Sequence, residues 1–130
     1  MPFTSLALVP EAGSSYLLPR TLGHRRTSEL LFFGEPFDTK TAYEAGLVSK
    51  ILPAAELHAH AKARALALTK RSPSALRETK RLLLGHERAA MLAQLDHEAD
   101  TFSSMLGTPE VVEAISAFFE KRAPDFQKLR

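Results

Sequence analysis

The stretch SPSALRETKRLLLG, residues 72–85, contains the clearest structural signals in the sequence. Ser72 is a residue type that caps helix N-termini, and Pro73 falls on the first helical position, where its missing N–H costs nothing. Gly85 is a typical helix end. Apolar side chains recur between them at steps of three and four, as on the buried face of a helix. The stretch therefore predicts a helix whose inner face comprises Leu76, Thr79, Leu82 and Leu83.

The same arrangement of cap and proline recurs at residues 108–110, where the sequence reads TPE. It predicts a second helix starting after Thr108, with Glu110 favourably placed on the positive end of the helix dipole. Pro124 would break this helix. Its inward face is expected to comprise Val112, Ile115, Phe118 and Phe119.

Helical periodicity covers most of the remaining chain. Residues 54–70 and 91–107 predict two longer helices, and residues 16–18, 24–33 and 39–45 predict three short ones. In the two longer helices the faces expected to be buried comprise Leu57, Ala61, Ala65 and Leu68, and Met91, Leu92, Leu95, Ala99, Phe102 and Leu106. Residues 47–52 (LVSKIL) are the principal expected strand, closed by Pro53, with at most a small pairing at residues 2–9.

Composition excludes several classes of function. There is no cysteine, so disulfides, thiolate metal sites and cysteine nucleophiles are ruled out. Seventeen basic against fifteen acidic residues leave a net charge of +2, and the basic residues are scattered, which argues against a nucleic-acid partner. No apolar run approaches the ~18 residues of a membrane span. Neither terminus resembles a targeting signal, so we expect a cytoplasmic protein without membrane association.

Four blocks, in unbroken order, carry a family resemblance. They read MPFTSLALVPEAGSSYLLPRTLG (1–23), ELLFFGEPFDTKTAYEAGLVSKILP (29–53), SPSALRETKRLL (72–83) and EAISAFFEKRAPDF (113–126). Together they resemble the crotonase superfamily of enoyl-CoA hydratases and isomerases. The resemblance implies a mainly α structure, the C-terminal helical region of a ββα-spiral fold, with one or two short strands. Residues 1–53 would end the spiral core, and residues 54–130 would form a helical lid and trimerisation region.

The resemblance also implies a chemistry. The family acts on acyl-CoA thioesters, whose carbonyl sits between two backbone N–H groups that stabilise an enolate. Those donors belong to the N-terminal half of the family's fold, and Met1 falls inside the first block. We therefore expect the chain to represent one half of a longer protein and to be inactive alone. The implied enzyme is a homo-oligomer, a trimer in the family, and uses no metal or redox cofactor, coenzyme A being part of the substrate.

Glu11 is the residue expected to do the chemistry. It stands in VPEAGSS, on a loop just before a predicted helix start, among apolar neighbours. An acidic residue at this place resembles the single base of the peroxisomal type of Δ3,Δ2-enoyl-CoA isomerase. Hydratases of the family have a second glutamate directly after the proline that matches Pro2, and Phe3 stands there instead. Since phenylalanine cannot transfer a proton, isomerisation is favoured over hydration. As a plain structural residue, Glu11 would only support the following helix start.

Three further residues are assigned to substrate binding by the resemblance, together with Phe3. Phe119 corresponds to a position near the acyl pocket, while Lys121 and Arg122 correspond to basic residues beside the CoA phosphates. In a purely structural reading the phenylalanine belongs to the core or a trimer interface, and the two charges are solvated. The pair His58 and His60 is two residues apart on a helix, so its side chains diverge and make a poor metal site.

Polar residues on the long helix and hydroxyls near Glu11 read as structural. Residues 96–100 (DHEAD) are expected to form a solvated helix face, and Ser14 and Ser15 are expected to cap a helix. Two functions besides an isomerase stay open. One is an enoyl-CoA hydratase or another lyase of the same fold, and the other is a helical oligomerisation module without catalysis.

Overall fold

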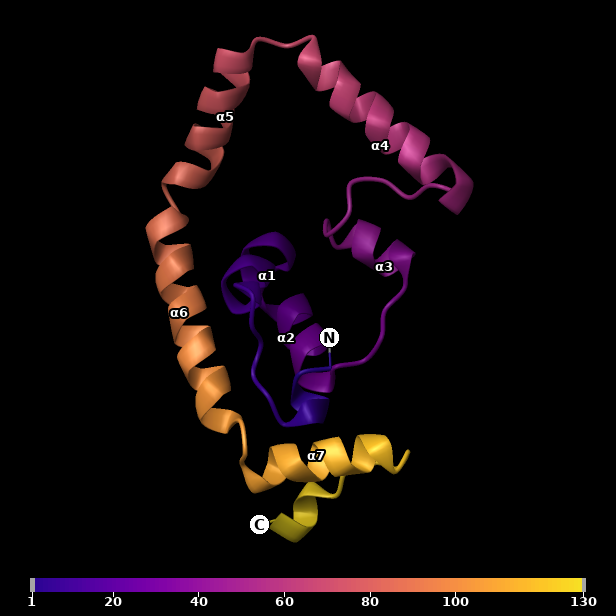
Figure 1. The fold of residues 1–130 in the computed structure, drawn as a ribbon, viewed down its shortest axis with the longest axis vertical. Helices are drawn as coiled ribbons and strands as arrows, with labels where there is room; N and C mark the ends of the chain where they lie inside the picture. Colours follow the sequence, from indigo (N-terminus) through magenta and orange to yellow (C-terminus); the bar gives the residue numbers. More distant parts are fainter. Residues whose placement is uncertain (1, 130) are drawn as a thin grey trace. The chain divides into compact units, whose positions relative to one another are not determined.

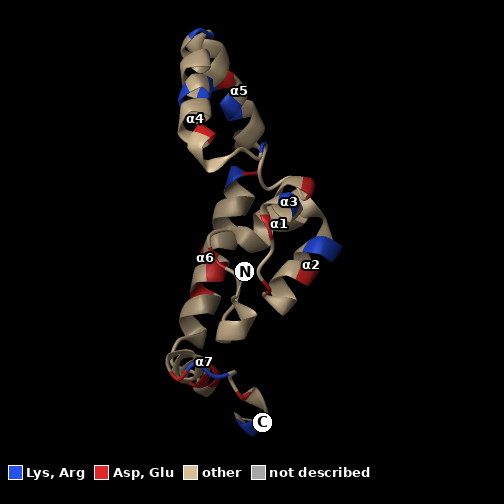
Figure 2. Cartoon of the chain, turned by 90° about the vertical axis from the view of Figure 1, so that its right-hand side faces the viewer, with Lys and Arg blue, Asp and Glu red and all other residues tan. Residues whose placement is uncertain are grey.

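The structure, a computed structural model, describes residues 2–129 and consists of helices joined by loops (Figure 1). By their contacts the residues form two compact units. One comprises the residues up to Asp38 together with those from Met91 onward, and the other comprises Thr39–Ala90. The expected boundary at residue 53 concerns the complete spiral and stays a prediction. Basic and acidic residues are scattered over the helices (Figure 2), in line with the small net charge.

The first unit is assembled from the two ends of the chain. Its N-terminal part contains the 3-10 helix η1 (Thr4–Leu6) and the helices α1 (Ser14–Leu22) and α2 (His24–Phe33). Its C-terminal part contains most of α6 (Arg88–Met105), then α7 (Pro109–Phe119) and the 3-10 helix η2 (Phe126–Leu129). α1 packs on α2, and α7 packs on both 3-10 helices. The buried apolar residues of this unit are Tyr16, Leu18, Leu31, Val111, Ala114 and Ala117.

Specific contacts fix η1 and α1 in this unit. The hydroxyl of Thr4 donates to the carbonyls of Leu31 and Phe32, at 3.2 and 3.0 Å, and so satisfies two carbonyls at the C-terminal end of α2. In α1 the guanidinium of Arg20 lies 3.4 Å from the centroid of the Tyr16 ring and also donates to the Tyr16 carbonyl. Pro19 lies inside α1, beyond its first turn, and its ring nitrogen cannot donate to the preceding turn.

The second unit comprises α3 (Thr39–Glu44), α4 (Ala54–Thr69) and α5 (Pro73–Gly85). Ala42 and Ala45 are its buried residues. The predicted helices are present, but the expected burial is wrong. All residues predicted for the inner faces of α4 and α5 are exposed. Helix formation depends on local sequence, whereas burial needs a partner surface, and the described residues provide none for these two faces.

Helix starts and ends agree closely with the sequence. The hydroxyls of Ser72 and Thr108 each accept from the backbone N–H three residues later, at 3.4 Å, as helix caps do. α2 ends at Gly34, whose φ of 66° is a left-handed conformation that suits glycine. The cap-and-proline predictions are therefore confirmed.

The buried stripe of α7 is displaced by one residue from the prediction, and that of α6 is displaced in part. In α6 the predicted Met91 and Phe102 are covered, as are Gln94, Glu98, Thr101 and Met105, while Leu92, Leu95, Ala99 and Leu106 are exposed. In α7 the small residues named above are buried, while Val112, Ile115, Phe118 and Phe119 are exposed. One residue is about 100° of helix rotation. α7 therefore exposes its bulkier apolar stripe, and α6 exposes most of its own.

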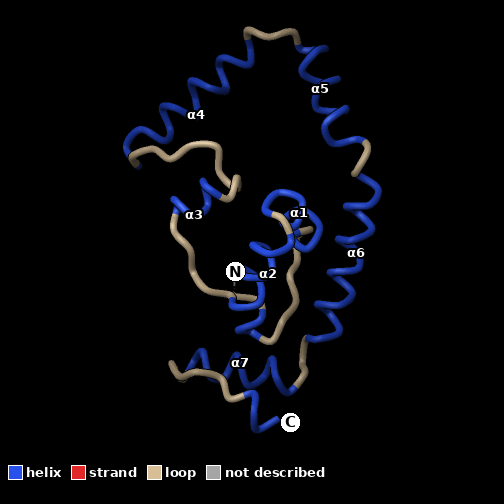
Figure 3. The backbone as a smooth tube through the Cα atoms, turned by 180° about the vertical axis from the view of Figure 1, so that it is seen from behind, coloured by secondary structure: helices blue, strands red, loops and turns tan. Residues whose placement is uncertain are grey.

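The predicted strand is wrong. Through residues 2–129 the backbone is helix, turn or loop, as Figure 3 shows, and residues 47–52 are irregular. Residues 2–9 contain η1 and loop, without a strand. A strand is stable only when paired, and no second strand is available within the described residues. The mainly α character itself is confirmed.

Candidate active site

The loop before α1 makes a sharp turn directly after Glu11. Ala12 and Gly13 follow with φ values of 59° and 74°, both in the left-handed region. The Glu11 carbonyl accepts from the backbone N–H of Ser14 at 3.1 Å and from its hydroxyl at 2.6 Å. These bonds close the turn, so the backbone of Glu11 is tied to the first turn of α1.

The side chain of Glu11 is exposed and lines a pocket of about 250 Å³. Apolar residues of α6 form the opposite wall, chiefly Leu95, Ala99 and Phe102, with Ser103 beside them. Leu95 and Ala99 are exposed positions of α6, and Phe102 is half-buried. A carboxylate at the edge of an apolar pocket can accept a proton from a carbon acid held against the apolar wall.

Glu98 of α6 provides the most extensive polar contacts in this region. The residue is 4% exposed, so the expected solvated face is wrong at Glu98, while Asp96, His97 and Asp100 are exposed as expected. One carboxylate oxygen accepts from the Gly13 N–H at 2.6 Å, and the other accepts from the Ser15 N–H at 2.8 Å and from the Ser15 hydroxyl. A carboxylate at this position satisfies N–H groups at the start of α1 and complements its dipole. Ser15 is thus not the cap itself.

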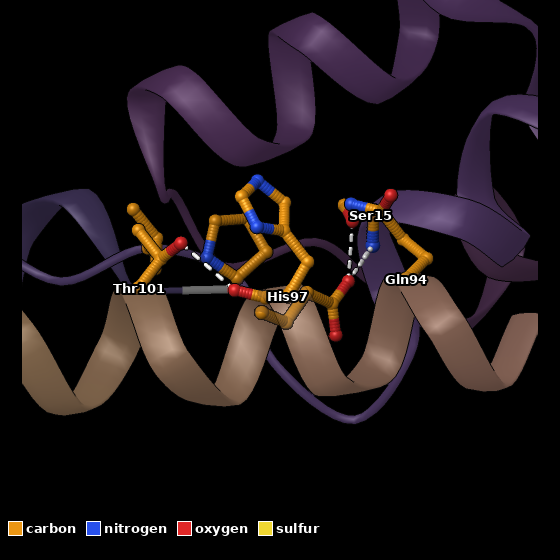
Figure 4. Close-up of a pocket in the computed structure, with 7 residues that line it drawn as sticks. Ser15, Gln94, His97 and Thr101 are labelled. Carbon is orange, nitrogen blue, oxygen red and sulfur yellow. Dashed lines mark hydrogen bonds between the residues drawn. The ribbon is translucent and has the colours of Figure 1, made fainter.

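A second, smaller pocket lies beside this contact (Figure 4). Its volume is about 180 Å³. Gln94 donates to the Ser15 hydroxyl at 3.0 Å, so this hydroxyl accepts from α6 and donates to Glu98 at once. Thr101 donates to the His97 carbonyl at 2.8 Å. The lining residues are Val9, Pro10, Ser15, Gln94, His97, Glu98 and Thr101.

The predicted substrate-binding phenylalanines lie in different surroundings. Phe3 is half-buried at the start of η1, where its carbonyl accepts from the N–H groups of Leu6 and Leu8. Phe119 ends α7 with 77% of its surface exposed, and its ring contacts that of Phe118 edge-on with centroids 5.7 Å apart. Neither lines the pocket of Glu11, and their predicted roles stay predictions.

The two predicted cations differ in their bonding. Lys121 is exposed and has a left-handed backbone, with φ of 56°, after the end of α7. Both terminal nitrogens of Arg122 donate to the Glu113 carboxylate, the Nη2–Oε2 distance being 3.1 Å. The Nε of Arg122 donates to Glu120 at 2.6 Å. The Arg122 hydrogen bond, aided by the N–H of Asp125, lowers the pKa of Glu113 to about 2, and both glutamates raise the pKa of Arg122. Phosphate binding by Arg122 would therefore compete with these ion pairs.

The described residues contain neither a metal cluster nor a membrane-spanning helix. Within residues 2–129, no three side chains of the His, Asp or Glu type gather as a metal site would require. Among the helices that the structure describes, none is long and apolar enough to cross a membrane. His58 and His60 lie on α4 at the expected diverging spacing.

The helices described above match the helical C-terminal portion of a known fold. One solved structure of this fold is the enoyl-CoA hydratase/isomerase from Pseudoalteromonas atlantica, with a TM-score of 0.91 and 37% identity over 96% of this chain and 50% of that one. The family model for enoyl-CoA hydratase/isomerase matches residues 1–129. The chain therefore belongs to the enoyl-CoA hydratase/isomerase family, which is the crotonase superfamily.

Curated relatives include both kinds of enzyme. The 2,3-dehydroadipyl-CoA hydratase of Escherichia coli is 33% identical over 98% of this chain and 50% of its own length. The peroxisomal enoyl-CoA delta isomerase 3 of Mus musculus is 27% identical over 94% of this chain and 38% of its own length. The chain thus spans half or less of these relatives. Since relatives named peroxisomal and mitochondrial occur beside bacterial ones, a cytoplasmic location stays a prediction.

Glu98 is the residue that sequence reasoning missed. A signal was available, because Met91, Gln94, Glu98, Thr101 and Met105 share one face of a helix. The apolar stripe beside that face was stronger, however. Most of the predicted buried face therefore lies one residue away from the observed one.

Proposed function

We propose that the complete protein is a Δ3,Δ2-enoyl-CoA isomerase with Glu11 as its single base. The observation that carries this proposal is the placement of the Glu11 carboxylate at an apolar pocket, on a turn tied to the start of α1. Phe3 supports it, because no carboxylate stands where hydratases of the family have their second one.

In this proposal Glu11 moves one proton between two carbons of an acyl-CoA. The carboxylate removes a proton from carbon 2 of a 3-enoyl thioester, and the electron pair shifts toward the carbonyl. The protonated Glu11 then returns the proton to carbon 4, so the double bond moves to position 2. No electrons leave the substrate and no water is added, so the reaction needs neither a redox cofactor nor a second carboxylate. Backbone N–H groups that stabilise the enolate would come from the other half of the fold.

Hydration is the alternative enzyme reaction. It is favoured by the hydratase names of several relatives, including the one from Escherichia coli. Water addition needs one group to activate the water and another to protonate carbon 2, and Phe3 can do neither. A non-catalytic helical module is the alternative outside the enzymes, and the exposed apolar faces of α4 and α5 favour it.

The test compares 3-enoyl-CoA isomerisation and 2-enoyl-CoA hydration by the complete protein. Glu11→Gln keeps the shape but removes the base, and general-base catalysis is typically worth ~10²–10⁴ in rate. We expect isomerase kcat to fall by that factor, with unchanged folding and CoA binding. The control Phe3→Glu should leave isomerisation no faster. Near-normal turnover by Glu11→Gln would place the base elsewhere and overturn the proposal.

Residues 1–130 are proposed to be inactive alone and to associate. The oxyanion-hole donors are implied to lie outside them, so thioester turnover should be undetectable with residues 1–130 and present with the complete protein. Turnover by residues 1–130 alone would contradict this.

Association is expected because large exposed apolar patches favour it, and α7 exposes Phe118 and Phe119 at 71% and 77%. We propose a homo-oligomer, a trimer in the complete enzyme. Sedimentation at micromolar concentration should show a species larger than the 14.3 kDa chain, and replacing both phenylalanines by serine should weaken it. A clean monomer would contradict the proposal.

A further inference from the structure

We propose that Glu98 is a positioning residue that holds the Glu11 turn in its active conformation. The inference rests on the proposed function of Glu11, and it assigns α6 a part in the chemistry. Glu98 itself does not meet the substrate, because its side chain is buried and its oxygens are already engaged.

The contacts of Glu98 lie two and four residues after Glu11. One oxygen holds the N–H of Gly13, and the other holds the N–H and hydroxyl of Ser15. The Glu11 carbonyl is itself bonded to the residue between them, Ser14. Each of these partners is a hydrogen-bond donor. Only a side chain with two accepting oxygens can therefore satisfy all of them. A glutamine would turn an NH₂ group toward a donor.

The backbone between Glu11 and α1 requires such an anchor. Ala12 has a left-handed conformation, with φ of 59°, which residues other than glycine rarely adopt. Such conformations persist only where the surrounding structure enforces them, and they occur frequently at active sites. Glu98 provides the bond that directly follows Ala12, at the Gly13 N–H, and this bond comes from a different segment of the chain.

The same helix supplies the pocket wall and the anchor. Leu95 and Ala99, neighbours of Glu98 on α6, line the pocket of Glu11. The distance between base and substrate is therefore set by one rigid element, provided that Glu98 keeps the turn against it. A general base must lie within about 2.6–3.2 Å of the atom that carries its proton, and a displacement of about 1 Å can cost on the order of 10²-fold in rate.

The test is Glu98→Gln in the complete protein, assayed at a temperature where circular dichroism shows every variant folded. We expect kcat for isomerisation to fall at least tenfold while KM changes less than twofold, because the substrate-binding wall is intact. Amide hydrogen exchange at Gly13 and Ser15 should accelerate. The matched control is Asp100→Asn, which neutralises an exposed acid on the same helix and should change neither readout.

A double-mutant cycle distinguishes positioning from general weakening of the fold. If Glu98 acts through Glu11, then Glu98→Gln should cost little further rate in a Glu11→Gln background, whereas independent effects would multiply. Should Glu98→Gln fail to fold, Ser15→Ala is the second variant, since it keeps both backbone bonds and should lower kcat two- to fivefold with the same non-additivity.

The outcomes separate this inference from the proposed function. Normal kcat in both Glu98→Gln and Ser15→Ala, with Glu11→Gln inactive, would overturn the positioning role and leave Glu11 as the base. Multiplicative effects in the cycle would also overturn it. Normal turnover by Glu11→Gln would instead overturn the proposed function, whatever Glu98→Gln does.

Discussion

The neighbouring valines of α7 allow a direct measurement of which helix face is packed. Val111 is 3% exposed and Val112 is 55% exposed, so the same substitution to alanine removes the same atoms from a covered and an open site. Burial is worth about 0.8 kcal/mol per methylene-sized group, which gives roughly 1.6 kcal/mol for the two groups lost at Val111. The cavity left behind adds to this cost, while the better helix propensity of alanine offsets roughly 0.5 kcal/mol.

We therefore expect Val111→Ala to lower the free energy of unfolding by about 1–2 kcal/mol. For Val112→Ala the lost burial is about half as large and is nearly cancelled by propensity, so a change within about 0.5 kcal/mol is expected. Urea unfolding followed by circular dichroism, at concentrations where sedimentation shows a monomer, measures both. Equal costs at the two positions would refute the assigned faces, and a larger cost at Val112 would show that α7 packs through its bulky stripe.

Two further predictions concern charge and backbone conformation. Because the pKa of Glu113 is held at about 2 in the fold against an ordinary 4.5, its stabilising contribution is fully present above pH 4.5 and is lost as the pH falls toward 2. Arg122→Gln should flatten this acid dependence in an unfolding series from pH 6 to pH 2, and an unchanged slope would contradict the assignment. Gly13→Ala should destabilise the chain by about 1–2 kcal/mol through its positive φ, since the added methyl would only meet Leu17 at 3.7 Å. The control Gly85→Ala, in a helix without such a φ, should be neutral or stabilising in the same thermal melts, and an equal loss at both positions would refute the backbone explanation.

Helix starts and ends could be predicted from the local sequence, whereas contacts between distant segments of the chain could not. Ser72 and Thr108 marked helix starts correctly because a cap and its N–H lie three residues apart. Residues 47–52 have the composition of a strand, yet pairing depends on a second backbone segment that nearby residues do not specify. The burial of Glu98 likewise depends on Gly13 and Ser15, which are 85 and 83 residues away in the chain.

Glu11 was singled out by its neighbours in sequence and lies at a pocket, and its role as the base stays a prediction. Arg122 illustrates the opposite case. Its position after α7 followed the family pattern, but its bidentate contact with Glu113, nine residues earlier, could not be inferred from that pattern.

The bond between Glu98 and Gly13 also has a consequence for the order of folding. It closes a loop of 85 residues, which includes the whole of Thr39–Ala90. The first turn of α1 therefore lacks the Glu98 carboxylate as an acceptor until α6 has packed against it. We expect the Glu11 turn to be among the last parts of the chain to become ordered. Loop-closure entropy grows only slowly, by about 0.6 kcal/mol per doubling of length. Insertions in the segment between Asp38 and Met91 should consequently be tolerated far better than a single substitution of Glu98.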